Sequence, residues 1–198
     1  MGRGHGGTGR STWRSGGGAE PHSPELERNL QLWEGAIRNR GNENVLAFDD
    51  KGMVKYMSQG DESSAEVEYD KIKNMVVTHN HPQESDHGLY RIGKSFSSAD
   101  LKAAIGADVK EMRIVTPTYT FSIQRPRKGW GKTESQVESA YNNIGRNVIG
   151  KRDTAYWKAG KTQAEKEKRV ERAFATQDHR IVKELARQFG WTYTYKKR

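Results

Sequence analysis

The sequence predicts an α+β fold in which a central mixed sheet is flanked by helices, with a flexible N-terminal arm and a basic helical C-terminal extension. The order of helix, hairpin, strand, helix, hairpin and further helices predicts the fold class. The first 24 residues are rich in Gly, Ser and Arg and have little apolar surface to offset the entropy of ordering them. Residues 127–198 carry 18 Lys and Arg against 8 Asp and Glu, whereas residues 1–126 carry 16 against 17. We therefore divide the chain into an arm (1–24), a folded domain (25–126) and a basic extension (127–198).

The first half of the domain predicts an amphipathic helix followed by a β-hairpin. Over residues 24–40, Ser23 can cap the helix and Pro24 suits its first position, and apolar residues recur at helical spacing. Residues 44–58 form two strands around a turn in which Gly52 can adopt a positive φ.

The second half of the chain continues with alternating short strands and helices. We expect a short polar helical segment at 66–73, a buried strand around 75–77, a helix at 97–107, strands at 111–117 and 118–126, helices from 132 onward, and a last strand at 191–195. Tyr193 and Tyr195 would share one face of that last strand.

The composition excludes several classes of protein. With no cysteine, the chain has no disulfide and no thiolate metal site, so any metal must bind through His, Asp or Glu. No segment reaches the roughly 20 apolar residues of a membrane helix, and the arm lacks the apolar core of a secretory signal. We expect a soluble protein that stays in the compartment where it is made.

Two histidines stand at the end of the predicted buried strand. Side chains alternate along a strand, so His79 and His81 point to one face and can hold one divalent metal ion. Pro82 ends the ladder and would leave the pair at the sheet edge, open to solvent. The alternative is an ordinary strand end that contains two histidines.

Ser97 and Asp100 begin the next predicted helix. A serine three residues before an acid is typical of a capping box, in which Ser97 caps the helix and Asp100 lies in its first turn. An aspartate held in this way can also be a third metal ligand. Two histidines and one aspartate leave a position for water, as in catalytic zinc sites.

Metal-assisted hydrolysis also requires a group that accepts and donates a proton. Glu43 precedes the first strand of the hairpin, whereas Glu34 lies within the amphipathic helix. We favour Glu43 as this acid/base, although a surface acid at a strand start fits the same spacing.

These residues together resemble a known family. The pattern H-x-H-P followed by S-x-x-D, with a glutamate near an upstream strand, resembles the JAMM/MPN metalloproteases, also called the JAB family, which includes deubiquitinating isopeptidases and RadC-like bacterial proteins. The segments VVTHNHP and SFSSADL are similar to segments of JAB-like domains of phage and phage head-morphogenesis-associated proteins. The resemblance covers roughly residues 35–126.

The resemblance implies a function and a role for each residue. His79, His81 and Asp100 would bind Zn²⁺, Glu43 would be the general acid/base, and Ser97 would help to stabilise the oxyanion. The protein would be a zinc-dependent peptidase or isopeptidase of phage or mobile-element origin that acts on a protein or peptide substrate in the host cytoplasm or in association with the virion.

One segment departs from the family pattern. Fourteen residues, Gln83–Phe96, separate Pro82 from Ser97, which is a longer spacing than the compact family pattern has. Such a loop could cover the cleft or shape a different substrate groove. Its Glu84, Asp86 and His87 are alternative ligands or solvated loop residues.

The basic extension supports a second, non-catalytic hypothesis. Residues 127–198 could bind nucleic acid or an acidic protein surface and so make the chain a phage assembly or nucleic-acid-binding protein. Three tryptophans there could stack on unpaired bases or pack in the core: Trp130, Trp157 and Trp191. Three further histidines fit surface or packing roles: His5 and His22 of the arm, and His179 of the final helix. An HNH nuclease ranks lower, because those nucleases draw their three residues from separate places and not from one tripeptide.

Overall fold

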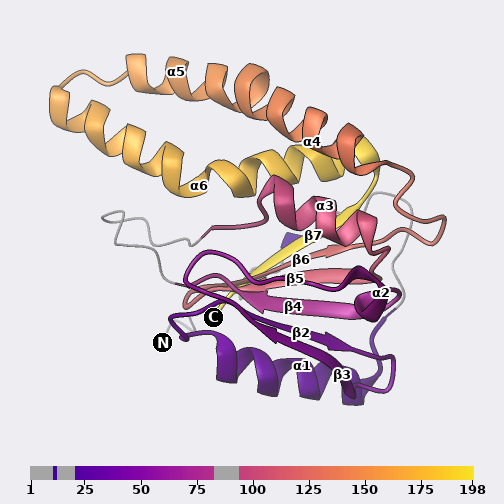
Figure 1. Cartoon of the computed structure of the whole chain (residues 1–198). Coiled ribbons are helices and arrows are strands. Elements are labelled where there is room, and N and C mark those ends of the chain that lie inside the picture. Colours follow the sequence, from indigo (N-terminus) through magenta and orange to yellow (C-terminus); the bar gives the residue numbers. More distant parts are fainter. Residues whose placement is uncertain (1–10, 13–20, 83–93) are drawn as a thin grey trace, which may run out of the picture.

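A computed structural model describes residues 11–12, 21–82 and 94–198 and has the expected α+β architecture, a mixed sheet flanked by helices (Figure 1). The strands of these residues form one sheet in the order β1-β7-β6-β5-β4-β2-β3. Only β4 and β5 pair in parallel; the other neighbours are antiparallel. The strands are β1 (Ser11–Thr12), β2 (Asn44–Phe48), β3 (Val54–Gln59), β4 (Val76–Asn80), β5 (Glu111–Val115), β6 (Tyr119–Gln124) and β7 (Thr192–Lys197).

Helices cover both faces of this sheet. One face is covered by α1, and the other by α3, α4 and the C-terminal part of α6 (Figure 1). The paired helices α5 and the first half of α6 extend beyond the sheet as a hairpin (Figure 1). The helices are α1 (Pro24–Ile37), α2 (Tyr69–Ile72), α3 (Ser98–Gly106), α4 (Glu134–Asn143), the π-helical turns η1 (Ile144–Ile149), α5 (Gly150–Lys158) and α6 (Gln163–Phe189).

The first helix and the hairpin form as predicted. Ser23 caps α1, because its Oγ accepts the Leu26 N–H at 3.2 Å. The turn between β2 and β3 contains Gly52 at φ +80°, a conformation that L side chains rarely adopt. The apolar stripe of α1 packs on one face of β2 and β4, and every residue of these two strands is buried. A strand buried on both faces lies inside a sheet and not at its edge.

The C-terminal third completes the same sheet and core. Strand β7 pairs with β6 along its whole length, from Thr192 to Lys197. Trp191 packs edge-on against Trp130 at 4.9 Å and donates its indole N–H to the Trp130 carbonyl at 3.0 Å. The sheet and the larger core therefore continue across the boundary expected at residue 126. Trp157, by contrast, is 41% exposed on α5.

The end of the predicted arm belongs to the folded domain, which corrects the assignment of His22 to a flexible segment. Its Nδ1 lies 3.0 Å from Glu27, and its Nε2 lies 2.6 Å from the buried Glu111. The second contact is an ion pair without the angle of a hydrogen bond. The contacts with Glu111 and Glu27 raise the pKa of His22 to about 9, against the opposing effect of burial. Residues 1–10, which include His5, and residues 13–20 lie outside the part of the chain that the structure describes.

Among the described residues, no helix is both long enough and apolar enough to cross a bilayer.

Candidate metal centre

The two histidines of the predicted pair meet at the end of β4. Their Nε2 atoms are 3.2 Å apart, so the two rings face the same side of the sheet. Strand β4 lies between β2 and β5, which corrects the expectation that Pro82 leaves the pair at a sheet edge. The backbone N–H of His81 still donates to Val115 of β5 at 3.1 Å, beyond the last residue of β4. The pair thus occupies the carboxyl end of a central strand.

A backbone carbonyl orients His81. Its Nδ1 lies 3.0 Å from the carbonyl oxygen of Lys94. A carbonyl can only accept, so Nδ1 carries the proton and the neutral ring keeps its lone pair on Nε2. Metal-binding histidines are commonly held by such a partner on the second nitrogen.

The Ser97–Asp100 pair forms the predicted capping box at the start of α3. Oδ2 of Asp100 accepts the Ser97 N–H at 2.7 Å and the Ser97 hydroxyl at 2.8 Å, while Ser97 Oγ accepts the Asp100 N–H at 3.2 Å. Oδ1 of Asp100 lies 3.2 Å from His79 Nε2. Oδ2 therefore caps the helix and lies 3.7 Å from His81 Nε2, whereas Oδ1 faces His79.

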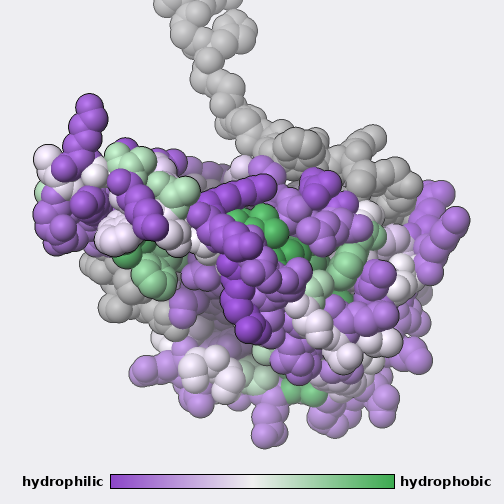
Figure 2. All heavy atoms as spheres, turned by 90° about the horizontal axis from the view of Figure 1, so that it is seen from above, coloured by the Kyte–Doolittle hydropathy of each residue, from purple (hydrophilic) through white to green (hydrophobic). Residues whose placement is uncertain are grey.

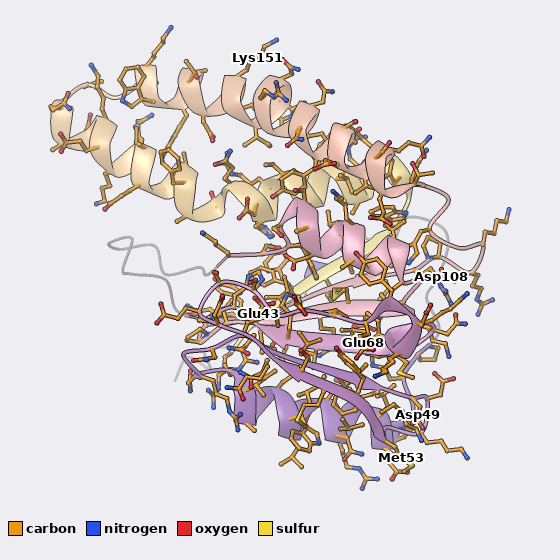
Figure 3. The ribbon with its side chains drawn as sticks, in the orientation of Figure 1. Glu43, Asp49, Met53, Glu68, Asp108 and Lys151 are labelled. Atoms are coloured by element: carbon orange, nitrogen blue, oxygen red, sulfur yellow. The ribbon has the colours of Figure 1, made fainter. Side chains whose placement is uncertain are left out.

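Of the two candidate glutamates, Glu43 reaches this site and Glu34 does not. Glu43 (labelled in Figure 3) precedes β2, and its Oε1 lies 3.8 Å from His79 Nε2. Glu34 bonds to Thr78 at 3.2 Å and forms an ion pair with Arg113 at 2.5 Å. Because Thr78 and His79 are adjacent in β4, they point to opposite faces, and Glu34 lies across the sheet from the histidines.

Burial and mutual charge shift the pKa of each titratable group here. Burial raises the pKa of Glu43. Burial alone would lower the pKa of His79, but the carboxylates of Asp100 and Glu43 outweigh it and raise that pKa. Burial lowers the pKa of His81. Burial opposes ionisation of Asp100, yet hydrogen bonding and charge from His79 hold its pKa far below the usual range.

The donor atoms fit a divalent ion. The ligand atoms of Glu43, His79 and His81 lie within 4.8 Å of one another, and Asp100 contacts both histidines, at 3.2 and 3.7 Å. Two nitrogens bound to one tetrahedral zinc at roughly 2.0–2.1 Å are separated by about 3.3 Å. The observed separation of the two Nε2 atoms, 3.2 Å, matches this value.

The centre lies in a large acidic cleft. Its volume is about 1580 Å³, and its described walls come from residues 62–69, from residues 116–118 beyond β5, from α3 and from α6. Lys94 is the one Lys or Arg among the described lining residues. The acidic lining residues are Glu43, Glu62, Glu66, Glu68, Asp100, Glu167, Glu171 and Asp178. Of the long loop Gln83–Phe96, residues Glu84, Asp86 and His87 lie outside the described segments.

Sequence reasoning missed Asn80, the residue between the two histidines. Its Oδ1 accepts the Asn44 N–H at 2.8 Å, and its Nδ2 donates to the carbonyls of Arg40 and Asn42 at 3.2 and 3.0 Å. This buried amide thereby holds the segment that carries Glu43 against β4. A polar residue in a buried strand is the signal that could have indicated such a role.

Comparison with known proteins does not assign the chain to a family. No family model matches the sequence, and neither the curated proteins nor the solved structures contain a match.

Proposed function

We propose that this chain is a zinc-dependent hydrolase of the JAMM type, acting as a peptidase or isopeptidase, with His79, His81 and Asp100 as the metal ligands. The observation that carries the proposal is the convergence of two imidazole nitrogens and one carboxylate oxygen beside Glu43. This is the donor set of an open, catalytic zinc site, with a separate acid placed to move a proton.

The residues around the centre have distinct tasks in this reaction. A bound zinc ion would polarise the scissile carbonyl and activate water. Glu43 accepts the proton of the attacking water and passes it to the leaving amine, a task that suits a carboxyl group whose pKa is raised by burial. Asn80 holds the Glu43 segment, and the Lys94 carbonyl keeps the His81 lone pair on Nε2. Ser97 positions Asp100, and its hydroxyl would have to turn away from Oδ2 to donate to an oxyanion.

The cleft favours a cationic polypeptide as substrate. Its described lining carries eight carboxylates against one lysine, so it attracts Lys- and Arg-rich segments and repels acidic ones. Phe174 and Trp157, 69% and 41% exposed, lie in the part of the cleft formed by the α5–α6 hairpin and provide contact area for an apolar side chain. This supports a protein or peptide substrate rather than an anionic small molecule.

Metal content and peptide hydrolysis, measured on the same preparations, test the proposal. Protein purified without added metal should contain one equivalent of zinc by elemental analysis, and Asp100→Asn should lose it. Glu43→Gln should keep the zinc and lose hydrolysis of a Lys- and Arg-rich fluorogenic peptide by about 10²–10⁴-fold. Glu62→Gln, a second cleft carboxylate removed in the same way, should keep both properties.

The outcomes separate the possible ligand sets. Loss of zinc in Glu43→Gln but not in Asp100→Asn would mean that Glu43 is the ligand and would overturn the assignment of roles. Absence of stoichiometric metal in the wild-type protein would overturn the metalloenzyme as a whole.

A further inference from the structure

A second cavity lies on the opposite side of α6 from the metal centre. It measures about 440 Å³, is open to solvent and is lined by β6, β7 and the α5–α6 hairpin. Helix α6 contributes Thr176 and Arg180 to this cavity and Phe174 and Asp178 to the metal cleft. At 100° per residue these two pairs fall on opposite faces of the helix. The cavity is therefore a separate site, which the proposed hydrolytic reaction does not use.

Aromatic rings form the floor of this cavity. Tyr119 and Phe121 of β6 stack at 5.7 Å with an interplanar angle of 24°. Tyr195 of β7 is the register partner of Phe121 and packs edge-on against His179 at 4.5 Å. Tyr119 and Tyr195 are only partly buried, so part of each ring is accessible. Partly exposed tyrosines on neighbouring strands form a surface on which planar rings can stack.

Arginines surround this aromatic floor. Arg152 of α5 and Arg172 of α6 line the cavity and are exposed to solvent. Arg180 also lines it and forms an ion pair with Asp153. Burial, together with the charges of Lys183 and Arg180, lowers the pKa of His179 to about 4, so this ring is neutral at neutral pH. The cavity lining thus carries three arginines and one aspartate.

Positive charge continues beyond the cavity in both directions. Besides the three arginines and one aspartate of the cavity lining, residues 150–183 contain seven Lys and Arg against four Asp and Glu. Lys197 of β7 is the register partner of Tyr119 and lies at the other end of the aromatic floor. Seen from above, the helical layer presents mainly hydrophilic side chains (Figure 2). A chain of phosphates longer than one nucleotide would therefore meet cations on both sides of the cavity.

We propose that this cavity binds single-stranded nucleic acid, with an unpaired base over Tyr119 and Tyr195 and the neighbouring phosphates on Arg152 and Arg172. The volume is within the roughly 300–1,000 Å³ of sites for small organic groups, so it can admit one nucleotide. Bases in a duplex are stacked on each other and do not offer a free face to such a floor. The site therefore selects single strands over duplexes.

The proposal is tested by fluorescence anisotropy with a labelled oligothymidine. A length of about ten nucleotides lies within the usual binding-site sizes of single-strand-binding proteins. The affinity should fall as the salt concentration rises. The double variant Arg152→Ala/Arg172→Ala should reduce the slope of log affinity against log salt concentration by about 1.4, which is about 0.7 for each lost phosphate contact. The matched control removes two other exposed charges of the hairpin, Lys151→Ala with Lys161→Ala. Lys151 points away from the sheet (Figure 3) and neither lysine lines the cavity, so this variant should keep the wild-type slope.

The aromatic floor is tested separately from the charges. Tyr195→Leu should weaken binding at least about fivefold, the lower limit for loss of one base–aromatic stack. Tyr119→Leu, at the first residue of β6, should do the same and replaces Tyr195→Leu if that variant does not fold. Thermal unfolding of each variant establishes that it is folded before its binding is measured.

Four results would overturn the proposal: no oligothymidine binding at low salt, equal loss of affinity in the two double variants, unchanged binding by both folded tyrosine variants, or equal affinity for a duplex of the same length. Polyglutamate distinguishes a nucleic acid from an acidic protein surface. If polyglutamate displaces the oligonucleotide at the same concentration of charges, the cavity binds any polyanion through charge alone, and the proposal is wrong. Since none of these measurements requires zinc or hydrolysis, their failure and the failure of the proposed function are distinguishable.

Discussion

Replacing Ser97 by Ala removes two hydrogen bonds from the start of α3. Ser97 Oγ accepts the Asp100 N–H at 3.2 Å and donates to Asp100 Oδ2 at 2.8 Å. Loss of a serine N-cap costs about 1 kcal/mol, within a range of roughly 0.5–2. The 2.7 Å bond from the Ser97 N–H to Oδ2 remains, so the carboxylate stays partly held. We expect the metal-free protein to lose about 1–2 kcal/mol of unfolding free energy, which corresponds to a fall in Tm of roughly 2–8 °C for a chain of this size.

The same substitution should also weaken metal binding. An outer-shell partner of a metal ligand typically contributes about 10–100-fold in affinity, and Ser97 is such a partner of Asp100. Thermal unfolding in chelator measures the cap, and zinc titration at constant pH measures the ligand. Ser98→Ala is the matched control, because it removes a hydroxyl from the same helical turn. If zinc affinity is unchanged while stability falls, Ser97 is only a cap, and the reasoning that Asp100 Oδ1 is a ligand oriented by this cap is refuted.

Three further predictions concern the other face of the sheet and the first hairpin. Protonated His22 stabilises the fold, and because its pKa is raised, this contribution is complete below the unfolded pKa near 6.5 and is lost as the pH rises toward about 9. In urea unfolding, the wild type should therefore lose about 1–2 kcal/mol relative to His22→Gln over that pH range, a value reduced for solvent screening. Parallel stability curves against pH for the two proteins would contradict this prediction. Arg113→Met should cost about 3–5 kcal/mol because it leaves Glu34 buried without its cation, and adding Glu34→Met should recover part of that loss. Gly52→Ala should lower the free energy of unfolding by more than about 1 kcal/mol, because the φ of Gly52 is +80° and the new Cβ would lie 2.9 Å from the α1 backbone. Gly35→Ala in α1 is the control: its new Cβ would have no neighbouring atom within 4 Å, so this variant should be neutral or more stable.

Local patterns in the sequence predicted most elements because their causes are local. The cap of α1, the positive φ of Gly52 and the capping box of α3 each involve residues within a few positions of one another. The alternation of a strand is equally local, and it placed His79 and His81 on one face. Wherever one turn or one strand decides the conformation, spacing alone is sufficient information.

Features that depend on strand order could not be predicted in the same way. The apolar run at 75–77 predicted a buried strand, but it does not identify β2 and β5 as the neighbours of β4, and Pro82 was taken to leave the histidine pair at a sheet edge. Choosing between Glu34 and Glu43 requires knowing which face of β4 the first helix covers. The second cavity joins β6, β7, α5 and α6, whose residues are up to 76 positions apart, from Tyr119 to Tyr195. Sequence spacing contains no signal for such a meeting.

The two faces of β4 hold carboxylates in opposite ways, and this difference bears on where a metal would bind. On the α1 face, Glu34 and Glu111 both pair with Arg113, whose guanidinium keeps its charge at every pH at which the protein is folded. On the other face, the ion-pair partners recorded for Glu43 and Asp100 are histidines. A histidine carries its charge only while it is protonated, and it can release that proton and offer a lone pair instead. The α1 face therefore keeps the permanent charge of Arg113 beside both carboxylates, and His22 is a further, titratable partner of Glu111. On the His79 face the described partners are histidines, so a divalent cation can take over the charge balance there.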